Sequence, residues 1–176
     1  MSAGLAMQRL RGQIVDLHPR RIFPGVLEWS GGRITRIVED HSVRENWFIA
    51  PGFVDAHIHI ESSMLPPAEF ARRAVVHGTV ATVSDPHEIA NILGVPGVNF
   101  MIRDGKRTPF KFHFGAPSCV PATAFETAGA VLTAPAVSRL LARRDIHFLS
   151  EVMNFPGVLA RDPSLMARRL LQPLRL

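Results

Sequence analysis

From residue 53 onward, stretches of β-forming residues alternate with stretches of helical spacing. Strands are expected at 53–60, 79–84, 111–114 and 146–150, and helices at 67–77, 86–93, 96–104, 135–143 and 163–172. Strands that alternate with helices pair in parallel through right-handed crossovers. The pattern therefore constrains residues 51–176 to an α/β fold, in which ligands gather at the carboxyl ends of the strands.

Residues before 51 have a different pattern. Short strands are expected at 12–17, 25–29, 33–38 and 47–49, with no helix between them. Ser30-Gly31-Gly32 is a turn signal that predicts a hairpin. Pro51-Gly52 interrupts the chain before the first strand of the α/β region, so we place a domain boundary between residues 50 and 51.

Composition excludes several classes of protein. A hydrophobic fraction of 47% with 20% charged residues is typical of a globular chain. The single cysteine, Cys119, rules out an internal disulfide and suits a reducing compartment, and the chain has no run of about 18 apolar residues. We expect a cytoplasmic protein with no membrane partner. The net charge of +5 comes from scattered arginine pairs without a nucleic-acid-binding motif, so we expect no nucleic-acid partner either.

The stretch 51–63 carries the strongest chemical signal. Alternation along an extended strand would place four polar side chains on one face: Asp55, His57, His59 and Glu61. Two imidazoles two residues apart on one strand can bind the same metal ion. Asp55 is interpreted as a structural residue that orients an imidazole. The alternative is an amphipathic strand with one hydrated face.

Polar residues also follow the other three predicted strands. Because the carboxyl ends of parallel strands meet at one edge of a sheet, these groups favour a single shared site. They are Asp85, His87 and Glu88 after the second strand, Ser118 and Cys119 after the third, and Glu151 and Asn154 after the fourth.

The acidic residues and His87 permit two interpretations each. Glu151 can bridge two metal ions, or it can be an N-cap or loop carboxylate. Asp85 can belong to the site or cap the helix that follows it. His87 and Glu88 have no capping role to fill, so we expect them to line the pocket or to orient a proton.

The remaining candidates carry weaker signals. Cys119 has no base or cation beside it in the sequence, which disfavours a nucleophile and favours a thiol that lines the pocket next to Ser118. His113 and His147 fall within predicted strands and are expected to be core histidines.

These motifs together resemble a known family. The segment 52–59, Gly-Phe-Val-Asp-Ala-His-Ile-His, resembles the first-strand signature of the amidohydrolase superfamily. The segments 59–65, 85–91, 117–123 and 151–157 resemble adenine deaminases of the bacterial type, and the likeness runs from about residue 12 to 160.

The resemblance implies a fold. It is the amino-terminal part of a metal-dependent (β/α)8 (TIM) barrel, with about four strands in residues 51–176, preceded by a β-sandwich segment in residues 1–50.

The resemblance also implies a reaction, the hydrolysis of adenine to hypoxanthine and ammonia by a metal-bound hydroxide. The cofactor would be Mn²⁺ or Fe²⁺ at a two-metal site, with Zn²⁺ as an alternative. His57 and His59 would bind one metal and Glu151 would bridge to the second. Glu151, His87 and Glu88 would be catalytic, while Ser118, Cys119 and Asp85 would bind the substrate, adenine.

The chain also departs from the family pattern. A full barrel needs about 250 residues, whereas the 176 residues less the first 52 leave 124, with no histidine after Glu151. We therefore expect an amino-terminal portion that is inactive alone. Two alternatives stay open. One is a non-catalytic remnant or half-barrel that pairs with another chain, including a second copy of itself. The other is a related amidohydrolase that acts on a different cyclic amide or amidine.

Overall fold

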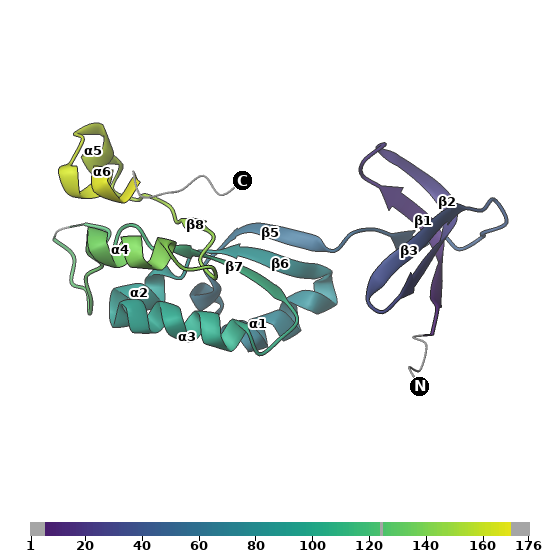
Figure 1. Ribbon diagram of the computed structural model, residues 1–176, viewed down its shortest axis with the longest axis horizontal. Helices are drawn as coiled ribbons and strands as arrows, with labels where there is room; N and C mark the ends of the chain where they lie inside the picture. Colours follow the sequence, from purple (N-terminus) through teal and green to yellow (C-terminus); the bar gives the residue numbers. More distant parts are fainter. Residues whose placement is uncertain (1–5, 124, 170–176) are drawn as a thin grey trace. The chain divides into compact units, whose positions relative to one another are not determined.

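The computed structural model describes residues 6–123 and 125–169, and the chain divides into two compact units, residues 1–51 and 52–176 (Figure 1). The first unit contains a four-stranded sheet in the order β3-β2-β1-β4. Its strands are β1 (Gln8–Asp16), β2 (Arg21–Ser30), β3 (Arg33–Glu39) and β4 (Phe48–Ile49). Antiparallel pairing joins β1 to β2 and β2 to β3, and β4 runs parallel to β1.

The predicted hairpin is confirmed. Ser30 pairs with Arg33, so Gly31 and Gly32 form a two-residue turn, and both have positive φ angles of 59° and 73°. Turns of this hand match the twist of the strands they join and require residues that tolerate positive φ. A β-sandwich stays a prediction, because the described residues of this unit form one sheet.

The second unit is built on a parallel sheet whose strands follow the chain order: β5 (Phe53–Ile58), β6 (Thr79–Ser84), β7 (Lys111–Ala116) and β8 (Phe148–Leu149). Parallel strands in sequential order, joined through helices, are the arrangement of a (β/α)8 barrel. The expected fold class, a partial barrel with about four strands, is confirmed.

The helices of this unit are η1 (Ile60–Ser63), α1 (Pro67–Ala74), η2 (Val75–His77), α2 (His87–Leu93), α3 (Val95–Gly105), α4 (Ala134–Leu141), α5 (Phe155–Leu159) and α6 (Pro163–Arg169). Proline in the first turn of α1, α3 and α4 presets the helical φ angle. The short helix α5 was not predicted. The last helix was predicted to continue to residue 172, and residues 170–172 lie outside the described part of the chain.

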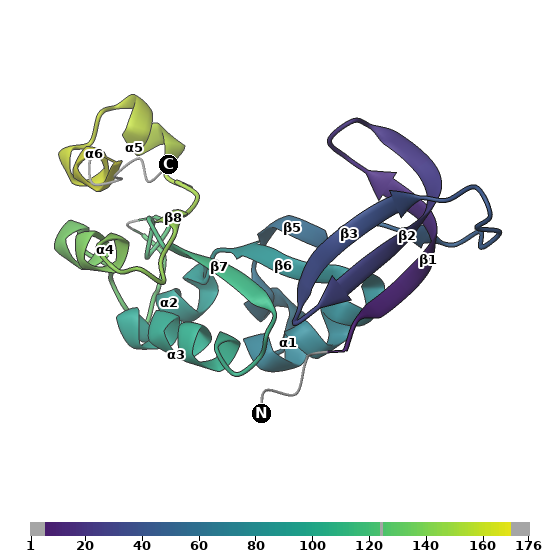
Figure 2. The ribbon, with the colours of Figure 1, turned by 45° about the vertical axis from the view of Figure 1, so that its right-hand side comes forward.

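Helices α1, α2 and α3 lie along one face of the sheet, as Figures 1 and 2 show. The core forms where α1 packs against β6, and where α3 and α4 pack against β7. Its most deeply buried members include Ile60, Ala90, Val98, Ala116 and Val137, each fully inaccessible to solvent. None of the helices formed by residues 6–123 and 125–169 is long and apolar enough to cross a membrane.

The first strand of this sheet differs from the prediction. It ends at Ile58 rather than at residue 60, and Ile60 begins the 3-10 helix η1, so Glu61 does not lie on the strand. The strand is also exposed, with Phe53 66% and Val54 58% accessible. The reason is its place at the edge of the sheet, where β6 covers only one side of it.

Candidate metal centre

Four potential metal ligands converge after three strands of the parallel sheet. They are His59 after β5, Asp85 and His87 after β6, and Glu151 after β8. One ligand atom from each residue lies within 4.8 Å of the ligand atoms of the other three. The expectation that polar residues at these strand ends would share one place is met by these four side chains.

The orientation of His59 is fixed by the backbone of the neighbouring strand end. Its Nδ1 lies 2.9 Å from the carbonyl oxygen of Asp85. Because a carbonyl can only accept a hydrogen bond, Nδ1 carries the proton and donates it. The lone pair is then on Nε2, which lies 3.3 Å from Glu151 Oε1. In this arrangement, a hydrogen-bond acceptor on one side of the ring presents the nitrogen on the other side to a metal.

His57 lies at the border of this cluster. Its Nε2 is 3.1 Å from His59 Nε2 and 3.8 Å from Glu151 Oε2, and its side chain is 55% exposed. Two ligand atoms about 2.0–2.1 Å from one ion are roughly 3 Å apart. The spacing of the two ring nitrogens therefore suits a shared ion.

Asp85 is buried and lies beside His87. The Asp85 side chain is 2% exposed, and neither of its carboxylate oxygens has a hydrogen-bond partner. His87 Nδ1 is 3.4 Å from Asp85 Oδ2 and 3.8 Å from Glu151 Oε1. The neighbouring Asp85 carboxylate raises the pKa of His87, against the effect of burial. A buried carboxylate without a hydrogen-bond partner is costly unless a nearby cation neutralises it, so this pair has the character of a ligand site.

Capping does not explain these carboxylates. The N-cap position of α2 is Pro86, and no side chain of the N-cap residue caps this helix, so the interpretation of Asp85 as its cap is wrong. The alternative interpretation of Glu151 as an N-cap is also wrong. Asn154 caps α5, and its side chain accepts a hydrogen bond from the Gly157 amide.

A second pair of carboxylates lies behind His59. Glu88 Oε2 is 3.7 Å from His59 Nδ1, and Glu88 Oε1 accepts a hydrogen bond of 2.9 Å from Ser62. Glu61 Oε1 accepts from the Ile89 amide at 3.2 Å. Burial raises the pKa of Glu61, and the nearby Glu88 carboxylate acts in the same direction.

Comparison with known proteins assigns this arrangement to a family. The profile of the amidohydrolase family matches residues 48–163, which span β5 to β8 and all four ligand residues. The chain belongs to the amidohydrolase family.

The amidohydrolase chain is also similar to curated adenine deaminases. The adenine deaminase of Salinibacter ruber is 57% identical over 159 residues, which cover 90% of this chain and 29% of the relative. That of Methanosarcina acetivorans is 56% identical over 162 residues, covering 92% and 29%. That of Borreliella burgdorferi is 47% identical over 156 residues, covering 88% and 28%. This amidohydrolase chain thus spans less than a third of the length of these relatives.

The donor set fits a metal of the kind that amidohydrolases use. Imidazole nitrogens and carboxylate oxygens suit zinc, iron and manganese, whereas calcium and magnesium prefer oxygen ligands alone. The unpartnered oxygens of the buried Asp85 and the Nε2 lone pair of His59 meet in one cluster with His87 and Glu151. The residues present therefore fit a divalent transition metal.

Ser118 and Cys119 lie under the end of β8. Ser118 Oγ donates to the backbone oxygen of Glu151 at 2.5 Å and also lies 3.4 Å from Cys119 Sγ. Both residues are almost fully buried. Their predicted contact with substrate stays a prediction, and the contact seen here is one that fixes the backbone at Glu151.

Sequence reasoning did not include Asp85 and His87 among the metal ligands, although it placed both at the site. The available signal was their position directly after β6, which corresponds to that of His59 after β5. It also missed the contacts of Glu61 and Ser62 with α2, which depend on how η1 packs.

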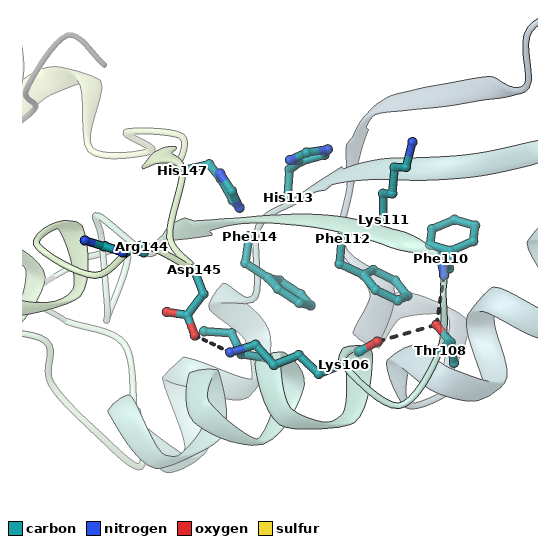
Figure 3. Close-up of a pocket in the computed structure, with 12 residues that line it drawn as sticks. Lys106, Thr108, Phe110, Lys111, Phe112, His113, Phe114, Arg144, Asp145 and His147 are labelled. Carbon is teal, nitrogen blue, oxygen red and sulfur yellow. Dashed lines mark hydrogen bonds and ion pairs between the residues drawn. The ribbon is translucent and has the colours of Figure 1, made fainter. Parts of the chain in front are cut away.

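A separate cavity of about 470 Å³ lies along β7 and the end of α3, and none of its lining residues belongs to the ligand cluster. Figure 3 shows Phe112 and Phe114 on one side of the strand and His113 on the other, with the Lys106–Asp145 ion pair below. The prediction that His147 is a core histidine is wrong, because its side chain is exposed at the sheet edge, where its ring contacts His113.

Proposed function

We propose that this chain supplies the metal-binding part of an adenine deaminase, which hydrolyses adenine to hypoxanthine and ammonia. The observation that carries the proposal is the cluster of His59, Asp85, His87 and Glu151 in an amidohydrolase whose curated relatives are named adenine deaminases. The similarity over nine-tenths of the chain supports adenine rather than another cyclic amide or amidine as the substrate.

In this proposal the four clustered residues and His57 hold the metal, with Mn²⁺ or Fe²⁺ as the proposed ion and Zn²⁺ as the alternative. When bound, such an ion lowers the pKa of a water molecule and polarises the substrate. The carboxylate of Glu151 has its two oxygens toward different imidazoles, Oε1 toward His59 and Oε2 toward His57. Glu151 is therefore the proposed bridge between two ions.

Protein side chains have to move protons in this reaction. Water adds through its oxygen to the ring carbon that bears the amino group, the carbon–nitrogen bond breaks, and ammonia leaves with a proton from the water. We assign this transfer to Glu88, which follows the ligand His87 in the first turn of α2 and whose Oε2 is buried without a hydrogen-bond partner. A carboxylate free on one oxygen can accept the proton from water and return it to the leaving nitrogen.

His87 has a different proposed task. The Asp85 carboxylate beside it raises its pKa, which favours the protonated ring when no metal is bound. A metal competes with that proton for the ring nitrogen. His87 is therefore proposed to exchange a proton for the metal. Ser118 and Cys119 are proposed to line the substrate pocket, where Ser118 also holds the backbone at Glu151.

A chimera tests the function in the context of a full-length relative. Residues 12–160 of this chain replace the matching segment of the Salinibacter ruber adenine deaminase, and ammonia release from adenine is measured with Mn²⁺ present. We expect activity in the chimera, a loss of at least about 100-fold in Glu88→Gln, and no change in the matched control Glu69→Gln, an exposed α1 residue. A folded, metal-loaded chimera that releases no ammonia would refute the proposal.

The open edges of the sheet favour a second proposal, in which the half-barrel pairs with another chain. Strand β5 is at one edge and β8 at the other, and Phe53 and Val54 of β5 are exposed. Exposed edge strands are templates for further strand pairing. Light scattering of the purified chain tests this proposal: a defined dimer supports self-association, and a monomer at high concentration excludes it. We also propose a cytoplasmic location without nucleic-acid or membrane partners, on the composition described above.

A further inference from the structure

We propose that Glu61 and Ser62 are positioning residues that hold the amino end of α2, and with it His87 and Glu88, at the metal centre. The inference rests on the proposed function, because it assigns these two side chains a purpose in the same site. They lie in η1, which begins directly after the His59 ligand. Helix α2 begins at His87, two residues after Asp85, whose carbonyl oxygen accepts from His59 Nδ1.

The first turn of α2 has no cap of its own. Its N-cap residue is Pro86, whose side chain has no oxygen to accept a hydrogen bond. The first four amides of a helix have no partner within the helix. Glu61 Oε1 accepts a hydrogen bond of 3.2 Å from Ile89, the third residue of α2. That amide is one of those that an N-cap side chain normally serves, so Glu61 performs the capping task from another segment of the chain.

Ser62 fixes the next side chain of the same turn. Its Oγ donates to Glu88 Oε1 at 2.9 Å, and the other Glu88 oxygen lies 3.7 Å from His59 Nδ1. The hydrogen bond from Ser62 therefore orients the Glu88 carboxylate so that its second oxygen faces the histidine. Together, Glu61 secures the backbone of α2 and Ser62 secures the Glu88 side chain that projects from it.

The turn that carries both residues is itself well held. Ile60 is fully buried in the core, and Ser63 Oγ donates to the Ile60 carbonyl at 2.6 Å. Met64 adopts a left-handed conformation with φ 61°, and its amide donates to the Glu61 carbonyl at 2.8 Å. Glu61 and Ser62 thus extend from a well-packed turn to the end of a short helix that its own N-cap residue does not cap.

The positioning role predicts different results for two substitutions of Glu61. In Glu61→Gln, the amide oxygen still accepts from Ile89, so α2 keeps its position. In Glu61→Ala the amide of Ile89 loses its partner and the first turn of α2 loosens. A residue that only contributed charge to the site would show equal effects in the two variants, because Gln and Ala remove the charge equally.

Two measurements on the full chain test the inference. Calorimetric titration with Mn²⁺ gives the dissociation constant, which we expect to rise about 10- to 100-fold in Glu61→Ala and to stay within about threefold of the wild-type value in Glu61→Gln. The matched control Glu69→Ala, on the exposed face of α1, should leave it unchanged. Hydrogen exchange of the Ile89 amide in metal-free protein should accelerate in Glu61→Ala and not in Glu61→Gln.

The outcomes separate this inference from the proposed function. If the wild-type chain binds no Mn²⁺, the proposed metal centre fails, and the Ile89 exchange rates still decide whether Glu61 holds α2. If the Ile89 amide exchanges as slowly in Glu61→Ala as in the wild type, the positioning role is overturned. Equal loss of Mn²⁺ affinity in Glu61→Gln and Glu61→Ala would overturn it too, because the Gln variant retains the acceptor and the fold.

Discussion

The substitution Ile60→Ala is expected to cost both stability and metal binding, because Ile60 anchors the turn between His59 and Glu61. Its side chain is fully inaccessible and belongs to the core cluster with Ala90 and Val98. Truncation of a buried isoleucine to alanine costs about 2–5 kcal/mol, through lost transfer free energy and the cavity that remains. Full burial places Ile60 in the middle of that range, at about 3 kcal/mol of unfolding free energy.

Urea unfolding followed by far-ultraviolet circular dichroism measures this cost. With a denaturant slope of about 2 kcal/mol/M, a loss of about 3 kcal/mol lowers the unfolding midpoint by roughly 1.5 M. The matched control is Ile92→Ala on α2, where the isoleucine is 64% exposed and the change should stay within about 0.5 kcal/mol. Equal midpoints for the two variants would refute the assignment of Ile60 as the anchor of η1.

Three further predictions concern other parts of the chain. Arg143 holds the pKa of Asp145 well below its usual range. The carboxylate therefore stabilises the fold above about pH 4 and loses that effect as the pH falls further. The urea midpoint should drop more steeply between pH 5 and 3 in the wild type than in Asp145→Asn. Asn154→Ala removes the cap of α5 and should lower the unfolding free energy by about 1 kcal/mol in the same assay. An unchanged unfolding midpoint would rule the cap out. Gly25→Ala would place a Cβ 2.6 Å from the Val38 carbonyl oxygen and should lower the midpoint of thermal unfolding. A midpoint equal to that of the wild type would contradict the close approach of β2 and β3.

The sequence was most informative where local chemistry determines structure. The alternation of strands and helices predicted the parallel sheet, because each helix had to cover the strand beside it. The two glycines at 31 and 32 predicted the hairpin, since a two-residue turn of this kind needs positive φ. The positions of His59, His87 and Glu151 after predicted parallel strands predicted that they share one edge of the sheet, and the structure brings them together there.

Prediction was less successful where a local hydrogen bond ends a regular element. The alternation rule extended the first strand to residue 60, but Ser63 Oγ donates to the Ile60 carbonyl and the backbone turns into η1 instead. Serine side chains compete with strand pairing in this way. Glu61 and Ile89 lie far apart in the sequence, so no local pattern predicts that Glu61 caps the helix at Ile89.

The ligand set could not be read fully from the sequence for a related reason. Asp85 looked like a capping residue or a substrate contact, and its character as a ligand depends on burial without a hydrogen-bond partner. The tautomer of His59 depends on the Asp85 carbonyl, which only the pairing of β5 with β6 brings within 2.9 Å. Both properties belong to the packed sheet.

The central claim is that the ends of β5, β6 and β8 hold a metal ion between them. An anomalous difference map from a crystal of the Mn²⁺-loaded chain, recorded at the manganese absorption edge, tests it directly. The account predicts a peak within coordination distance of His59 Nε2 and of the Asp85, His87 and Glu151 side chains. A manganese peak elsewhere, with none in this cluster, would contradict it.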